Sequence, residues 1–91
     1  MNTPSITVTP SQPTVGLDAT AEATWTTPPV GPVTIIITDL TTEPPTVIAS
    51  RSFSADPYKL TFNPDNAGAH LVTVTWRNGE DSTSQGFNVQ T

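Results

Sequence analysis

The chain has 91 residues, with eight acidic and three basic side chains and a net charge of −5. This length predicts a single domain that spans residues 1–91. The three cations, Arg51, Lys59 and Arg77, are too few to neutralise a run of phosphates. We therefore expect neither a nucleic acid nor an anionic membrane as partner. The chain has no cysteine, which excludes a disulfide and thiolate chemistry.

Three blocks of alternating apolar and polar residues come first in the chain. Ser5–Thr9 is the first, and Pro10 and Pro13 then interrupt the pattern, as expected between two half-strands at a sheet edge. Asp18–Thr26 places its alanines and a tryptophan on one face. Val33–Leu40 follows a proline-rich turn. The period of two predicts that each block is a β-strand.

The next two blocks differ in regularity. Thr46–Ser54 is the least regular, because Arg51 shares a face with Val47, Ala49 and Phe53. Its strand register is therefore the one that the alternation defines least. Tyr58–Asn63 alternates cleanly and is bounded by prolines on both sides.

The last two blocks, Ala69–Arg77 and Ser82–Gln90, flank the dipeptide Asn78-Gly79. Asn-Gly is a strong hairpin signal, because both residues tolerate the positive φ of a type I′ turn. We predict a two-residue loop with Arg77 opposite Glu80.

The same register places His70 opposite Phe87. Directly opposed residues share one face of a sheet, so this arithmetic brings the apolar residues of both strands to one side. The chain lacks the apolar spacing of an amphipathic helix. Seven short strands without a helix predict an all-β, seven-stranded antiparallel immunoglobulin-like β-sandwich with no disulfide. The predicted core is Ile6, Val8, Ala21, Ala23, Trp25, Val33, Ile35, Ile37, Tyr58, Leu60, Phe62, Val72, Val74, Phe87 and Val89.

Two segments carry a resemblance to known families. Residues 65–72 resemble the Asp-x-Ala-Gly-x-Tyr-x-Cys run that opens strand F of immunoglobulin domains, with His70 in place of the tyrosine and Val72 in place of the cysteine. The resemblance implies that Gly68 makes the turn and that the His70 ring bonds to nearby backbone. Residues 23–29 and 32–35 resemble fibronectin type III modules near their strands B and C. Bacterial and phage immunoglobulin-like domains combine such features without a disulfide.

The sequence offers no constellation for chemistry, and we expect no catalytic, cofactor-binding or metal-binding residues. His70 is the only histidine, no cysteine can serve as its nucleophile, and no serine has a Gly-x-Ser-x-Gly context. Glu80 and Asp81 are the only adjacent carboxylates, and neighbours on a strand face opposite ways. Trp25 and Trp76 are in phase with apolar faces, which favours core packing over an exposed binding platform.

We therefore expect a non-catalytic structural or interaction module with a protein partner. The chain opens Met1-Asn2-Thr3-Pro4 with no basic segment before an apolar one, which predicts the absence of a secretory signal. This start and the lack of cysteine favour a phage virion accessory assembled in the host cytoplasm, such as a capsid decoration or tail-displayed protein. The alternative is an excised repeat of a bacterial surface or secreted protein, an adhesin or spacer module. We expect contact through the proline loops, an edge strand and the segment Met1–Ser5.

Overall fold

The computed structural model describes residues 3–91, and they form seven strands with no helix long and apolar enough to cross a membrane. Each strand overlaps one predicted block, and the bounds differ by at most two residues. The strands are β1 (Ser5–Thr9), β2 (Ala19–Thr24), β3 (Val33–Asp39), β4 (Thr46–Phe53), β5 (Tyr58–Phe62), β6 (Gly68–Trp76) and β7 (Asp81–Val89). The prolines of the sequence lie outside the strands, because proline has no N–H to donate to a sheet ladder.

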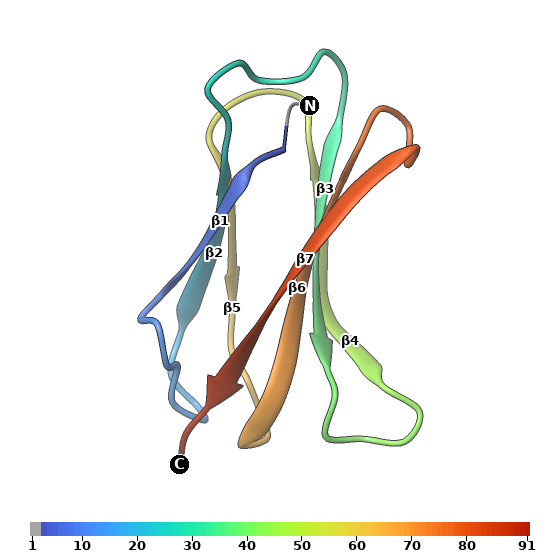
Figure 1. Ribbon diagram of the computed structural model, residues 1–91. Helices are drawn as coiled ribbons and strands as arrows, with labels where there is room; N and C mark the ends of the chain where they lie inside the picture. The colour runs from blue at the N-terminus through green and yellow to red at the C-terminus, as the bar shows by residue number, and fades with distance from the viewer. Residues whose placement is uncertain (1–2) are drawn as a thin grey trace.

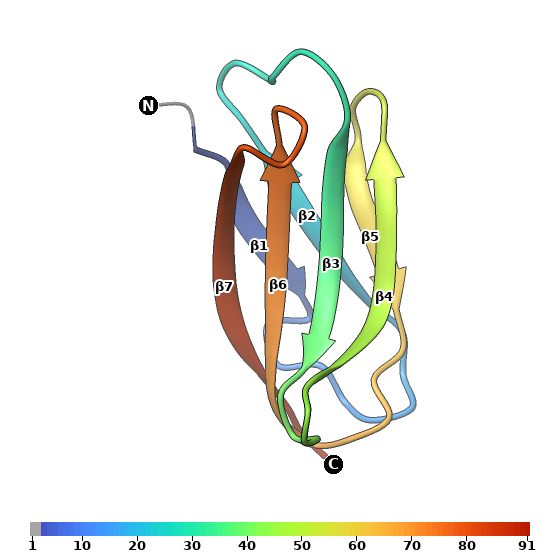
Figure 2. The ribbon, with the colours of Figure 1, turned by 90° about the vertical axis from the view of Figure 1, so that its right-hand side faces the viewer.

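The strands form two antiparallel sheets that face each other as a sandwich (Figure 1). One sheet has the order β1-β2-β5 and the other has the order β4-β3-β6-β7. A second view places β1 and β7 along one lateral side of the sandwich and β4 and β5 along the other (Figure 2). The predicted all-β, cysteine-free sandwich of seven antiparallel strands is thus confirmed.

The core lies between the sheets and follows from the alternation of each strand. In β3, Val33, Ile35 and Ile37 are buried while the residues between them are partly exposed. Every predicted core residue is buried except Ile6 and Trp25, which are partly buried against the core. Trp25 packs against the core, as predicted, without being fully buried, because β2 ends at Thr24 and the indole lies beyond the last ladder pair.

Trp76 is buried, which confirms the core packing expected of it. It packs edge-on against Trp25, with ring centroids 5.5 Å apart, and Trp25 packs edge-on against Tyr58 at 5.3 Å. Edge-to-face contacts of this kind are favourable beyond their buried area. This aromatic cluster covers the end of the core at which β2 and β6 both end.

A bulge in β4 explains its irregular sequence. Ile37 pairs with Ala49 but Thr38 pairs with Val47, so the register shifts by one residue and Ile48 is the extra one. The shift turns the Val47 side chain away from the core, and this side chain is 58% exposed. The expectation that Val47 shares a face with Ala49 is therefore wrong.

The β6–β7 hairpin has the predicted register but a wider turn. His70 lies opposite Phe87, and the last ladder pair is Trp76 with Asp81. Asn78 and Gly79 have φ of 57° and 84°, as the type I′ prediction requires. Arg77 is also left-handed, with a φ of 53°, so four residues rather than two separate the strands.

The Arg77 side chain forms an ion pair with a second carboxylate besides the predicted one. Its guanidinium donates to Asp81 at 3.0 Å and lies 3.9 Å from the predicted partner, Glu80. A left-handed Arg77 leaves the regular ladder, so its side chain no longer stands directly across from Glu80.

The prolines between β1 and β2 carry the chain from one sheet to the other, as predicted for an edge of two half-strands. β1 pairs with β2, whereas Thr14 forms a parallel bridge with Gln90 after β7. The Val15 N–H donates to the Gln90 carbonyl at 2.9 Å, and the Gln90 N–H donates to the Pro13 carbonyl at 2.8 Å. Residues 13–15 therefore tie the end of the chain to the first strand connection.

Candidate functional site

One end of the sandwich gathers the β2–β3 loop, the β4–β5 loop, the β6–β7 hairpin and the start of β1 (Figure 1). The β2–β3 loop contains Pro28, Pro29 and Pro32, and between them Val30 is 96% exposed. An apolar side chain at the tip of a loop stabilises nothing in the isolated domain. A proline-rich loop also loses little conformational freedom on binding, since proline fixes φ. We call residues 27–32 the proline loop.

The N-terminal segment fits only part of the prediction made for it. Met1 and Asn2 lie outside the described residues. Thr3 and Ser5 are exposed, but Pro4 is buried. Removing Pro4 therefore takes away a packed side chain, and a test of this segment should retain it.

A buried polar corner lies at the opposite end of the sandwich, where β3 ends and β6 begins. The Asp39 and His70 side chains are both buried, and the Asp39 Oδ1 lies 3.7 Å from the His70 Nε2. The Asp39 carboxylate accepts from the Thr41 N–H at 2.8 Å, from the Thr41 hydroxyl at 2.5 Å and from the Asn66 amide at 2.8 Å. These bonds fasten the β3–β4 and β5–β6 loops to the end of β3.

The His70 ring bonds to nearby backbone, as expected from the sequence. Its Nδ1 lies 3.0 Å from the Gly68 carbonyl, which only accepts, so in the neutral ring Nδ1 carries the proton. The ring also packs 5.5 Å from Phe87, its cross-strand partner. Asp39 was not recognised from sequence, although an aspartate in the buried phase of a strand was the available signal.

The charge of the corner is set mainly by Asp39. Burial by itself raises the pKa of this carboxyl, but the hydrogen bonds from Thr41 and Asn66, with a smaller contribution from His70, outweigh it and lower the pKa below its ordinary value. An ionised, fully bonded carboxylate holds two loops in place. The His70 ring and the Asp39 carboxylate are both buried, and their contacts join two loops to the sheet.

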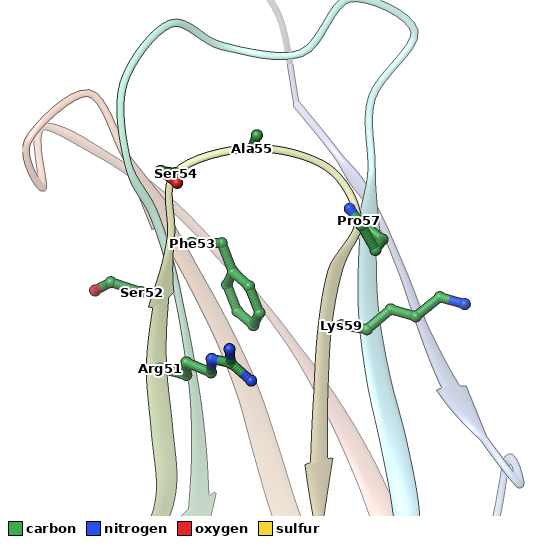
Figure 3. A pocket seen from close by; sticks show the side chains of 7 residues that line it. All are labelled: Arg51, Ser52, Phe53, Ser54, Ala55, Pro57 and Lys59. Atoms are coloured by element: carbon green, nitrogen blue, oxygen red, sulfur yellow. The ribbon is translucent and has the colours of Figure 1, made fainter.

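A third feature is a cleft of about 400 Å³ between the β4 and β5 edges, lined by residues 51–55, Pro57 and Lys59 (Figure 3). The Arg51 guanidinium lies over the Phe53 ring, 5.1 Å from its centroid. This contact explains why an arginine occurs on the apolar phase of β4: the cation covers an aromatic face at the open side of the core. The Lys59 side chain points away from Arg51 (Figure 3), so the two cations do not converge.

Within residues 3–91, no group of three or more histidine, aspartate and glutamate side chains is placed to hold a metal ion. Comparison with family models, curated proteins and solved structures finds no match to the chain. The site therefore has to be argued from its own geometry, and the proline loop is the feature with the clearest unused binding capacity.

Proposed function

We propose that the protein is a non-catalytic interaction module of the immunoglobulin-like class and that it binds a protein partner through its proline loop. Two features support the immunoglobulin-like class. The His70 ring bonds to the Gly68 carbonyl at the start of β6, and the chain pairs first with β2 through β1 and then, after its prolines, with Gln90 of the other sheet through Thr14. The fourth strand pairs with the third rather than the fifth, which departs from the constant-type immunoglobulin arrangement.

The observation that carries the binding proposal is the 96% exposure of Val30 in a loop stiffened by prolines. Loops at the end of a sandwich are placed by a rigid scaffold and carry recognition on this architecture. A partner with a small apolar pocket would bury Val30 at little cost in loop ordering.

For the biological setting we propose a phage virion accessory, a capsid decoration or tail-displayed protein. This step is an analogy at the level of fold, supported by a small sandwich that needs no disulfide and so can form in a reducing cytoplasm. The second candidate is a repeat of a bacterial surface or secreted protein. Mass spectrometry of purified particles separates them: a virion protein is present in them at a fixed copy number.

The binding proposal is tested by Val30→Ser with Val47→Ser as its matched control. Both valines are exposed, but Val47 lies on β4, away from the proline loop. In co-sedimentation with particles, or with the separated partner, Val30→Ser should weaken binding by about tenfold, the loss of roughly 1.4 kcal/mol of apolar contact. Val47→Ser should bind like the unchanged protein. Equal binding by both variants would remove the proline loop from the interface.

A further inference from the structure

The tip of the β6–β7 hairpin is exposed and has an unusual backbone. Arg77, Asn78 and Gly79 follow one another with positive φ. All three are exposed, at the end of the sandwich that also carries the proline loop (Figure 1). Glycine adopts this conformation freely and asparagine tolerates it, whereas most other residues resist it. Backbone strain is thus concentrated in an exposed turn, beyond the last ladder pair of the hairpin.

Two backbone hydrogen bonds hold this tip. The Gly79 N–H donates to the Trp76 carbonyl at 3.2 Å. The Glu80 N–H donates to the Arg77 carbonyl at 3.1 Å. Both distances are at the long end of the range for such bonds, and local opening costs least at an exposed loop tip. The β6–β7 ladder begins below them, at Trp76 and Asp81, so the tip can open while the ladder stays intact.

The Asn78 side chain is free to rotate. In the described part of the chain its amide forms no hydrogen bond. The amides of Asn63 and Asn66, by contrast, both donate to aspartate carboxylates, at 3.2 Å and 2.8 Å. Asn88 lies within β7, with its backbone in the ladder opposite Ala69. Asn78 therefore differs from the other described asparagines in having both a free amide and a place outside the strands.

The residue after an asparagine matters as well, because its backbone nitrogen can attack the side-chain amide. A side chain on the attacking residue hinders this approach, and Gly79 has none. A Cβ at Gly79 would meet no atom within 4 Å, so the surroundings leave room for the ring that the attack closes. The other described asparagines precede proline, which has no N–H, alanine and valine. Asn78 is thus the described asparagine with the least hindered nucleophile beside it.

We propose that Asn78 is a site of spontaneous deamidation. When the tip opens, the Gly79 N–H leaves the Trp76 carbonyl and gives its proton to base. The Gly79 nitrogen then bonds to the Asn78 Cγ, and the bond from Cγ to the side-chain nitrogen breaks, which releases ammonia and leaves a succinimide ring. Water adds to either carbonyl of the ring and opens it to aspartate or isoaspartate. The net change consumes one water, releases one ammonia and replaces the amide by a carboxylate.

The modification changes both the charge and the backbone of the tip. It adds one negative charge to a molecule whose net charge is −5. The new carboxylate lies beside Glu80 and Asp81, which already share the Arg77 guanidinium. Isoaspartate also adds a methylene to the backbone of the four-residue loop between β6 and β7. The hairpin tip is therefore remodelled without an enzyme.

The proposal is tested by incubating the folded full chain in a mildly alkaline, ammonia-free buffer. Peptic digestion at acid pH, followed by mass spectrometry with electron-transfer fragmentation, gives the aspartate and isoaspartate fraction at each asparagine. Position 78 should convert to both products, while positions 63, 66 and 88 keep their amides. Gly79→Ala should slow the conversion by at least about tenfold, because the added methyl group hinders the attacking nitrogen. The matched control, Gly86→Ala, should convert at the unchanged rate.

The peptide of residues 76–81 gives the rate that Asn78 has without the fold. If Asn78 keeps its amide in the folded chain over many half-lives of that peptide, the turn protects the site and the proposal is wrong. Conversion of Asn66 or Asn88 as fast as Asn78 would also overturn it. So would a Gly79→Ala variant that converts at the unchanged rate, or aspartate formed with no isoaspartate, which excludes the succinimide ring.

Discussion

Gly68→Ala is the most informative single change in this fold, because the residue begins β6 and supports the polar corner. Gly68 has a φ of +122°, a conformation that residues with a Cβ rarely adopt. A Cβ built there would lie 2.7 Å from the Thr41 Cγ2. Thr41 is not free to rotate away, since its N–H and hydroxyl both donate to the buried Asp39 carboxylate.

The expected cost has two parts that the other glycines allow to be separated. Backbone strain contributes about 1–3 kcal/mol. Displacing Thr41 weakens a hydrogen bond to a charged group and adds about 1–2 kcal/mol. We expect Gly68→Ala to lower the free energy of unfolding by about 3 kcal/mol in total, a large share of the 5–15 kcal/mol that is usual for a small domain.

Two matched controls use the same substitution. Gly79 has a φ of +84° but no atom within 4 Å of its Cβ position, so Gly79→Ala should show strain alone, about 1–2 kcal/mol. A Cβ at Gly86 would meet only the His70 carbonyl oxygen at an ordinary 3.8 Å, and the Gly86 backbone is not left-handed. Gly86→Ala should be neutral or stabilising by up to about 1 kcal/mol, because glycine weakens a strand.

Urea unfolding followed by tryptophan fluorescence and circular dichroism measures all three variants, with the m value as a check on two-state behaviour. We expect Gly86→Ala to be the most stable variant, Gly79→Ala to be intermediate and Gly68→Ala to be the least stable. If Gly68→Ala and Gly79→Ala cost the same, contact with Thr41 plays no part in the corner. If Gly68→Ala is as stable as Gly86→Ala, neither the positive φ of Gly68 nor its contact with Thr41 constrains the corner.

Two further predictions concern the core and the corner. Trp76→Ala should lower the free energy of unfolding by about 3–5 kcal/mol in the same urea titration. Trp25→Ala should lower it less, because Trp76 is buried and Trp25 is only partly buried. The reverse order would contradict the described core. The lowered pKa of Asp39 contributes stability that is present above the ordinary carboxyl range and is lost as the pH falls through the folded-state value. Asp39→Asn should therefore lose less stability than the unchanged protein between about pH 5 and pH 2. Asp65→Asn, at an exposed carboxyl, should follow the unchanged protein. If Asp39→Asn and the unchanged protein lose stability equally over this pH range, the hydrogen bonds to the Asp39 carboxylate contribute nothing to stability.

The sequence by itself determined the strands, the hairpin register and most of the core. These depend on local rules: a period of two puts alternate residues on one face, and an Asn-Gly turn sets which residues stand opposite each other. The pairing of His70 with Phe87 follows from counting outward from the turn, so no knowledge of the other sheet was needed.

Only the tertiary structure decided the features that depend on contacts between distant segments. The bulge at Ile48 arises where β4 pairs with β3. Trp25 lies at the edge of the core because β2 ends at Thr24, the residue before it. The Asp39 corner joins residues from two loops and two strands, and the parallel bridge between Thr14 and Gln90 joins the β1–β2 connection to the segment that follows β7. Alternation along one strand cannot report such partners, since the energy that selects them comes from packing and hydrogen bonds across the sandwich.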